Sequence, residues 1–269
     1  MKKRHVFFVS DRTGITAETL GESLLTQFPD FEFHRTNIPF VSNALGAEAA
    51  ASTIQRAAEQ DGQQPIVFST LTDPDAQAVI ANSSPHVFDL FGTFIDPLEA
   101  ALGVESSHTA GRMHGIKDSK DYETRLDAVN YSLGHDDGLR AHDFSEADVV
   151  LIGVSRCGKT PTCLYLAMHY SLKAANYPLT EDDFDQPRLP AALKACRKKI
   201  YGLTIVPEQL SRIRHQRRPE GAYSTLPQCR KEVANAEALF KNEGINFLDT
   251  TTVSIEEIAA TIVRDKSLH

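Results

Sequence analysis

Residues 153–160 have the sequence Gly-Val-Ser-Arg-Cys-Gly-Lys-Thr, the complete G-x-x-x-x-G-K-[ST] pattern of a phosphate-binding loop. In such a loop the glycines let backbone N–H groups turn inward around phosphate oxygens. Lys159 is expected to neutralise the terminal phosphate, and the Thr160 hydroxyl is expected to hold Mg²⁺. The pattern predicts a site for a nucleotide or another polyphosphate. Its candidate contacts are Gly153, Val154, Ser155, Arg156, Cys157, Gly158, Lys159 and Thr160.

The residues around this loop favour the same interpretation. The apolar run 149–152 predicts a buried strand before the loop, and Pro161 opens a helical pattern after it that includes Cys163 and Leu166. A strand that enters the loop and a helix that leaves it are the context in which this motif binds phosphate. That context disfavours the alternative of a glycine-rich turn that binds nothing.

Composition and charge narrow the class of protein. The 269 residues are 41% hydrophobic and 24% charged, as in ordinary globular proteins. The formal net charge of −8 argues against nucleic acid as the main partner, because a nucleic-acid backbone needs a basic face. The apolar run 6–9 is too short for a signal-peptide core, and no run approaches a membrane span. We therefore expect a cytoplasmic enzyme that binds neither nucleic acid nor a membrane.

The four cysteines show no C-x-x-C pairing and no regular zinc spacing, which favours reduced thiols. Cys157 lies inside the phosphate loop at a predicted helix N-terminus, an environment that lowers the pKa of a thiol. Sensitivity to oxidation is one interpretation of this position. An unreactive loop residue is the simpler one.

Strand and helix patterns alternate in the first part of the chain, which predicts βαβ units and a parallel sheet. The polar stretch 105–119 is the expected domain boundary. A helix should follow, ending at Gly134 as a left-handed cap, with an apolar face formed by Tyr122, Leu126, Val129 and Leu133. The expected strands are 5–9, 31–38, 65–70 and 87–91, and the expected helices are 16–28, 44–60 and 75–82.

The second half continues the same pattern. Ser254 and Glu257 have capping-box spacing at the start of the last expected helix. The expected strands are 149–152, 174–177, 200–205 and 245–248. The predicted fold class is therefore α/β, in three regions: an N-terminal parallel-sheet domain (1–105), a connecting loop and helix (106–145), and a P-loop kinase-like α/β domain (146–269).

Two other polar motifs follow expected elements. The segment 10–14, Ser-Asp-Arg-Thr-Gly, comes after the first strand, where open α/β sheets bind ligands and a helix N-terminus favours anions. An ordinary helix entry is an equal alternative there. The segment 135–138, His-Asp-Asp-Gly, offers a general base for an acceptor hydroxyl or a ligand for Mg²⁺. A solvated acidic turn is the alternative.

A basic run and scattered histidines are weaker signals. Residues 212–218, Arg-Ile-Arg-His-Gln-Arg-Arg, would suit docking of an acidic surface, but a solvated helix face is the favoured interpretation. The spacing of His108, His114, His135 and His142 matches no zinc pattern, so ordinary polar side chains are expected.

Taken together, these motifs resemble the bacterial phosphoenolpyruvate synthase regulatory protein family, and the resemblance runs over essentially the whole chain. Arg12 departs from it, since relatives often have a small residue after the N-terminal Ser-Asp. Cys157 and Thr162 favour the synthase branch over a sister branch that acts on pyruvate, phosphate dikinase. The segments that carry the resemblance are 9–14, 135–138, 153–162, 165–167, 175–178 and 202–205.

The resemblance implies a bifunctional enzyme. As a kinase, such a protein uses ADP to phosphorylate a threonine of the synthase and inactivate it. As a phosphorylase, it uses inorganic phosphate to remove that group and releases pyrophosphate. Phosphoenolpyruvate synthase is then the expected partner, and Mg²⁺ the expected metal, held by Thr160. The sequence leaves the oligomeric state open, with a homodimer as one alternative.

The resemblance also implies roles for individual residues. Asp136 or Asp137 would accept the threonine proton, and Arg156 would contact the transferring group beside Lys159. Ser10 and Asp11 become candidate contacts to the cofactor. A small-molecule ATP kinase and a non-catalytic nucleotide sensor remain the alternative functions.

Overall fold

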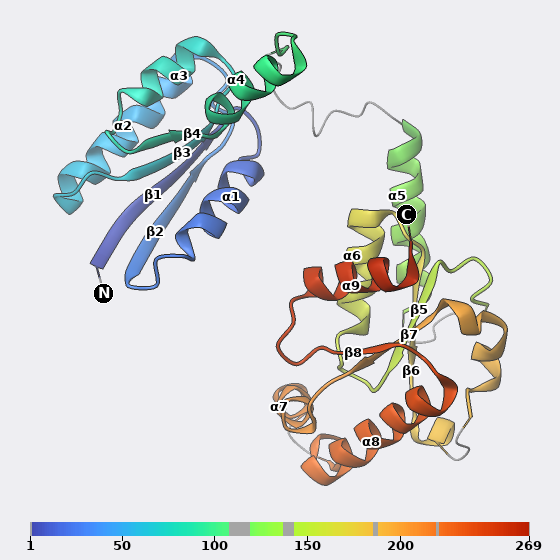
Figure 1. Ribbon diagram of the computed structural model, residues 1–269. Helices are drawn as coiled ribbons and strands as arrows, with labels where there is room; N and C mark the ends of the chain where they lie inside the picture. Colours follow the sequence, from blue (N-terminus) through green and yellow to red (C-terminus); the bar gives the residue numbers. More distant parts are fainter. Residues whose placement is uncertain (1, 108–118, 137–142, 185–187, 219–220, 269) are drawn as a thin grey trace. The chain divides into compact units, whose positions relative to one another are not determined.

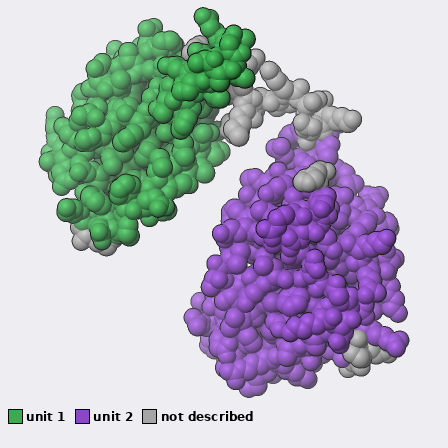
Figure 2. Space-filling model, viewed as in Figure 1, with its two compact units in different colours: residues 1–115 green, residues 116–269 purple. Residues whose placement is uncertain are grey.

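The chain divides into two compact units, residues 1–115 and 116–269 (Figure 2). Each unit contains a parallel four-stranded sheet with helices on both faces (Figure 1). The predicted α/β class is therefore confirmed. None of the described helices is long and apolar enough to cross a membrane. The computed structural model describes residues 2–107, 119–136, 143–184, 188–218 and 221–268.

The sheet of unit 1 has the strand order β2-β1-β3-β4. Side chains alternate along β1, so that Phe7 and Val9 pack in one apolar cluster with α2 and α3, whereas Val6 and Phe8 pack on the opposite face with α1. The elements are β1 (Lys2–Ser10), α1 (Ile15–Leu25), β2 (Phe31–Ile38), α2 (Ala44–Asp61), β3 (Ile66–Thr70), α3 (Pro74–Ala81), β4 (Val87–Asp89) and α4 (Leu90–Leu102).

Strand β4 is shorter than the predicted strand 87–91 because a helix cap interrupts it. Oδ1 of Asp89 accepts hydrogen bonds from the N–H groups of Phe91 at 3.1 Å and Gly92 at 3.0 Å. This carboxylate satisfies donors that the first helical turn leaves unpaired, so α4 begins at Leu90.

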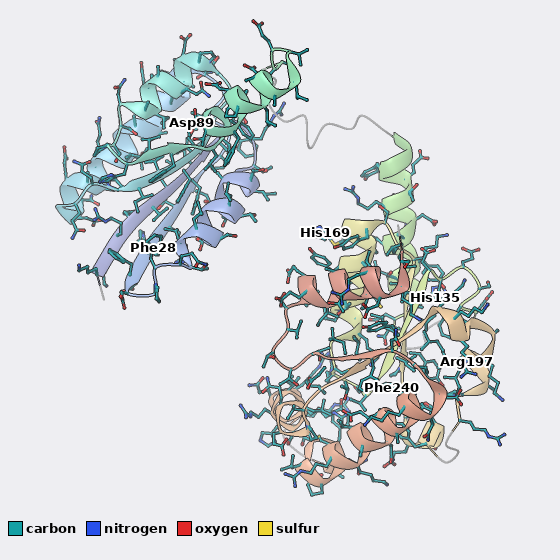
Figure 3. All side chains as sticks on the ribbon, viewed as in Figure 1. Phe28, Asp89, His135, His169, Arg197 and Phe240 are labelled. Carbon is teal, nitrogen blue, oxygen red and sulfur yellow. The ribbon has the colours of Figure 1, made fainter. Side chains whose placement is uncertain are left out.

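Unit 2 repeats the same topology with the strand order β6-β5-β7-β8. Helices α6 and α9 lie on one face of this sheet and α7 and α8 on the other, with Phe240 of α8 in the core (Figures 1 and 3). The elements are α5 (Ser119–Gly134), β5 (Val149–Gly153), α6 (Lys159–Tyr170), β6 (Ala174–Pro178), η2 (Glu181–Phe184), η3 (Ala191–Lys199), β7 (Ile200–Thr204), α7 (Pro207–Arg217), η4 (Ala222–Ser224), α8 (Leu226–Glu243), β8 (Phe247–Asp249) and α9 (Ile255–Lys266).

Helix α9 has the predicted capping box: the Ser254 hydroxyl accepts from the N–H of Glu257, and the Glu257 side chain accepts from the N–H of Ser254. The prediction for α5 is wrong in two respects. Gly134 is the last residue of the helix and has no positive φ, so it is not a left-handed cap.

The predicted apolar face of α5 is the second error. Tyr122, Leu126 and Leu133 are exposed, whereas Ala128 and Ser132 are buried. Because these buried side chains are small, α5 can pack closely on α6.

In each sheet the second strand pairs on one side of the first strand, and the third strand pairs on the other side. The order of strands therefore reverses at a switch point, between β1 and β3 in unit 1 and between β5 and β7 in unit 2. Ligands of open α/β sheets bind at the carboxyl ends of the strands at such points. The phosphate loop follows β5, and the segment 10–14 follows β1. The fold therefore presents two loops at topologically equivalent positions.

Candidate functional site

The phosphate loop joins the fully buried strand β5 to helix α6. A Cβ atom on Gly153 would lie 2.2 Å from the carbonyl oxygen of Leu203 in β7, so the neighbouring strand excludes any side chain there. Gly158 has a φ of 94°, in the left-handed region that glycine adopts without strain. Both glycines of the motif are thus required by the backbone, and α6 starts at Lys159 rather than at the expected Pro161.

Lys159 turns back over the loop. Its side chain is almost completely buried, and its Nζ donates a hydrogen bond to the carbonyl oxygen of Val154 at 2.9 Å. A pocket of about 210 Å³ adjoins it, lined by Ser155, Arg156, Gly158, Lys159, Thr160 and Pro161. A phosphate group that enters this pocket meets the positive end of α6, whose first turn has no side-chain cap.

Asp136 binds directly to the end of this loop. Its Oδ1 accepts a hydrogen bond from Thr160 Oγ1 at 2.7 Å and another from Asn176 Nδ2 at 2.6 Å. Asn176 Nδ2 also lies 3.1 Å from Thr160 Oγ1. The three side chains form a polar cluster that joins the turn after α5, strand β6 and the phosphate loop.

The turn that carries Asp136 is held by its backbone and by His135, which lies at the end of α5 (Figure 3). The carbonyl oxygen of His135 accepts from the N–H of Asn176 at 3.1 Å. The His135 ring stacks on Tyr131 at 3.9 Å, and its Nδ1 lies 2.8 Å from the Tyr131 carbonyl oxygen. Burial, together with the charges of Asp143 and Glu146, raises the pKa of Tyr131 to about 12, so this neighbour stays neutral.

The cluster fits a magnesium ion. The hydroxyl of Thr160 and the carboxylate of Asp136 are hard oxygen donors in contact with one another, and Mg²⁺ takes a few protein oxygens while water and substrate phosphate complete its shell. Within the described part of the chain, no group of three or more His, Cys, Asp and Glu side chains could hold a metal. A two-residue site of this kind suits Mg²⁺ better than zinc, which needs a closed set of ligands.

Arg156 is the exposed cation of the loop. Its φ of 76° lies in the left-handed region, which is strained for a residue with a side chain. The guanidinium makes no ion pair or side-chain hydrogen bond with the residues that the structure describes. It is therefore available to a ligand at the pocket.

Cys157 is a buried residue of this loop. Burial raises the pKa of its thiol, although the charge of Lys159 opposes that shift. The thiol thus remains neutral near pH 7, which favours the simpler of the two interpretations made from the sequence.

Sequence reasoning missed Arg214. A solvated helix face was the favoured interpretation of residues 212–218, and this is wrong for Arg214, whose side chain is 0% exposed. Nη2 of Arg214 donates to the carbonyl oxygen of Ser155 in the phosphate loop at 3.1 Å. One signal was present in the sequence: Arg214 stands four residues after the buried Leu210, on the same side of helix α7.

The candidate residues fall into three groups. Asp136, Lys159 and Thr160 come together with the rest of the loop 153–160 in unit 2. Asp137 lies outside the described residues, as do His108, His114 and His142.

Ser10 and Asp11 belong to unit 1. There Ser10 Oγ accepts from the N–H of Arg12 at 3.2 Å, and Asp11 Oδ2 accepts from Thr72 at 2.8 Å. Their role at the cofactor stays a prediction.

Comparison with known proteins gives consistent matches over the whole chain. The family model described as kinase/pyrophosphorylase matches residues 6–263. A relative from Halorhodospira halophila (strain DSM 244 / SL1) is 53% identical over 266 residues, which cover 98% of this chain and 97% of the relative. A relative from Azoarcus sp. (strain BH72) is 50% identical over 267 residues, which cover 99% and 96%. Both relatives carry, provisionally, the name phosphoenolpyruvate synthase regulatory protein.

Proposed function

The chain belongs to the kinase/pyrophosphorylase family, and we propose that it phosphorylates a threonine of phosphoenolpyruvate synthase with ADP and removes that phosphate with inorganic phosphate. In the kinase direction the threonine oxygen attacks the β-phosphorus of ADP, the bond to the bridging oxygen breaks, and AMP leaves. In the other direction inorganic phosphate attacks the phosphorus of phosphothreonine. The threonine hydroxyl leaves after protonation, and pyrophosphate is released.

The contact between Thr160 and Asp136, next to Lys159, is the observation that carries this proposal. Phosphoryl transfer requires positioning and charge neutralisation more than covalent help from the protein. A phosphate loop supplies backbone donors and one buried ammonium group, and the adjacent carboxylate and hydroxyl supply oxygens for a metal. This set of groups supports transfer of a phosphoryl group as well as binding of the nucleotide.

Mg²⁺, held by Thr160 and Asp136, would neutralise charge on the phosphate oxygens. Lys159 would bind the β-phosphate of ADP, which is the phosphate that is transferred. Arg156 would bind the same group from the open side of the pocket, since a guanidinium matches phosphate geometry.

The proton of the threonine hydroxyl needs a separate acceptor. Oδ1 of Asp136 already accepts two hydrogen bonds, from Thr160 and Asn176, which suits a residue on the metal side of the site. We therefore assign proton acceptance to Asp137, the next residue in the sequence. Phosphate, the nucleophile of the reverse reaction, is already ionised and needs this base less.

The decisive experiment incubates the full chain with purified phosphoenolpyruvate synthase, Mg²⁺ and either ADP or ATP. Mass spectrometry of the synthase should find phosphothreonine with ADP, and AMP should accumulate in equal amount. Adding inorganic phosphate to the phosphorylated synthase should release pyrophosphate. The Lys159→Ala variant serves as the control for contaminating kinases.

Other outcomes identify the rival functions. Consumption of ATP without phosphothreonine would indicate a small-molecule kinase. Binding of ADP with no turnover in either direction would indicate a nucleotide sensor. The same assay with pyruvate, phosphate dikinase tests the sister activity, and a faster reaction with the dikinase would overturn the assignment of the synthase.

A further inference from the structure

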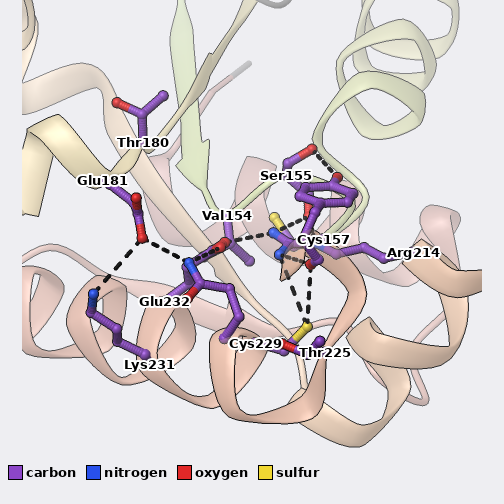
Figure 4. Close-up of polar contacts among 12 residues, drawn as sticks. Val154, Ser155, Cys157, Thr180, Glu181, Arg214, Thr225, Cys229, Lys231 and Glu232 are labelled. Carbon is purple, nitrogen blue, oxygen red and sulfur yellow. Dashed lines mark hydrogen bonds and ion pairs between the residues drawn. The ribbon is translucent and has the colours of Figure 1, made fainter. Parts of the chain in front are cut away.

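Arg214 is a buried cation that contacts the phosphate loop from helix α7 (Figure 4). Its Nη2 and Nε donate to the carbonyl oxygen of Ser155 at 3.1 and 3.3 Å. Nη2 also donates to Glu232 Oε2 at 2.6 Å, and Nη1 donates to the carbonyl oxygen of Tyr223 at 3.0 Å. The guanidinium stacks 4.1 Å above the Tyr223 ring. Glu232 thus compensates the charge of Arg214, while Nη2 and Nε of the guanidinium donate to the loop.

The contact with Ser155 sets the direction of the next peptide group. In a trans peptide the C=O and N–H bonds point in opposite directions, and the described residues include no cis peptide bond. Because the Ser155 carbonyl faces Arg214, the N–H of Arg156 must face away from Arg214. That N–H belongs to the residue with a φ of 76°, a conformation that a side chain disfavours. Arg214 thus restrains this peptide group from outside the loop.

Two hydroxyl groups add to that restraint. The Tyr223 hydroxyl lies 2.9 Å from Ser155 Oγ, so the side chain as well as the carbonyl of Ser155 is fixed. On the other side of the loop, Thr250 Oγ1 donates to the carbonyl oxygen of Cys157 at 3.1 Å. The loop is therefore attached at both ends of its strained segment to elements far away in the sequence.

We propose that Arg214, Tyr223 and Glu232, termed here the arginine latch, position the phosphate loop so that its N–H groups meet the β-phosphate of a nucleoside diphosphate. This inference rests on the proposed function, because it takes the loop as the site of ADP. Arg214 acts through Ser155 and is a positioning residue. Since Glu232 neutralises its charge, the latch contributes orientation of the loop rather than attraction for the phosphate.

Orientation and charge are separable because lysine keeps the charge of Arg214 and loses the planar fork. An ammonium group cannot donate to Ser155, Tyr223 and Glu232 in the geometry of a guanidinium. If the latch works by orientation, Arg214→Lys disturbs the loop. If it works by charge alone, the same variant behaves like the wild type.

The test uses the full chain with Mg²⁺ and ADP as the probe. Arg214→Lys is compared with Arg217→Lys, the same change at an exposed position of the same helix, and with Tyr223→Phe, which keeps the ring beneath the guanidinium. Isothermal titration calorimetry measures ADP affinity well below the melting temperature of each variant. Hydrogen exchange of residues 154–158 without nucleotide measures how firmly the loop is held.

We expect ADP affinity to fall about 10-fold or more in Arg214→Lys, because a misplaced loop loses several contacts together. Tyr223→Phe should lose about 2- to 10-fold, the value of one neutral hydrogen bond. Amide exchange in the loop should accelerate in both variants and remain unchanged in Arg217→Lys.

Several results would overturn the latch. A lower melting temperature with unchanged affinity and unchanged loop exchange in Arg214→Lys would leave Arg214 a purely structural residue. If Arg214→Lys does not fold, wild-type affinity and exchange in Tyr223→Phe decide against the latch. Failure of the wild-type chain to bind ADP would overturn the proposed function instead, whereas loop exchange still tests whether the latch restrains the loop.

Discussion

Two replacements of Arg156, by glycine and by alanine, separate the effect of its side-chain charge from the effect of its backbone conformation. Both variants remove the guanidinium. Alanine keeps the cost of a left-handed φ of 76°, and glycine removes it. Because the Arg156 side chain is exposed and makes no ion pair or side-chain hydrogen bond with the described residues, its removal alone should change stability little.

The expected magnitudes follow from the conformation of this residue. A left-handed conformation costs a residue with a side chain about 1–2 kcal/mol. Glycine also lowers the free energy of unfolding by about 0.5–1 kcal/mol, because it has greater freedom in the unfolded chain, and this offsets part of the gain. Arg156→Gly should therefore be more stable than Arg156→Ala by about 0.5–1 kcal/mol, which raises the melting temperature of a unit of this size by about 1–4 °C.

Activity should fall equally in the two variants, although their stabilities differ. If Arg156 binds the transferring phosphoryl group, both variants should lose about 10²–10³ in the rate of threonine phosphorylation. Thermal unfolding and initial rates with ADP measure the two effects. Equal stability of the two variants would refute the assignment of strain, and a wild-type rate in Arg156→Ala would refute the role of the guanidinium. A rate lost in Arg156→Gly but kept in Arg156→Ala would mean that loop rigidity matters and the charge does not.

Three further predictions test the rest of the site. Lys159→Ala should keep the fold and lose about 3–4 kcal/mol of transition-state stabilisation in both directions; near-normal phosphorylation would contradict its assignment. Asp137→Asn should slow ADP-dependent phosphorylation by about 10² or more and phosphorolysis less, whereas Asp136→Asn should slow both directions alike and recover partly with excess Mg²⁺. Because burial raises the pKa of all four cysteine thiols, they should stay neutral and react slowly with a thiol reagent at pH 8 until guanidinium chloride exposes them. Rapid labelling of native Cys157 would contradict that prediction.

The position of the loop between β5 and α6 and the strand pattern could be predicted because their signals lie in continuous stretches of sequence. The two glycines of the motif reflect the backbone: Gly153 is required by the Leu203 carbonyl of the neighbouring strand β7, and Gly158 by its own positive φ. The alternation of strands and helices follows from burial on both faces of a parallel sheet. Short-range chemistry also placed the capping box of α9 correctly.

Long-range contacts could not be predicted from the same patterns. In the sequence, Arg214 is one of several arginines on a charged helix. Its burial depends on contacts with Glu232 and Tyr223, which come later in the chain. Asn176 likewise looks like a polar residue in a strand, although it joins Asp136 to Thr160. In helix α5, large apolar side chains are exposed to solvent because small side chains pack closely against α6. A periodicity argument assumes that the largest apolar face is the buried one, and that assumption failed there.

The two switch-point loops show which part of the site is due to the fold and which to particular residues. Both loops have Val-Ser near their start: Val9 and Ser10 are the last residues of β1, and Val154 and Ser155 follow β5. Each loop ends with a left-handed glycine, Gly14 or Gly158, that precedes a helix with no side-chain cap. Both helices therefore direct unpaired N–H groups toward the edge of a sheet. The first helical residue differs: it is Lys159 in unit 2 and Ile15, which is 54% exposed, in unit 1. A polyphosphate carries several negative charges that backbone dipoles alone compensate weakly, at roughly half a charge per helix end. We therefore infer that unit 2 is the nucleotide site because of Lys159 and because Asp136 and Thr160 would hold Mg²⁺ there, and not because of the topology that both units share.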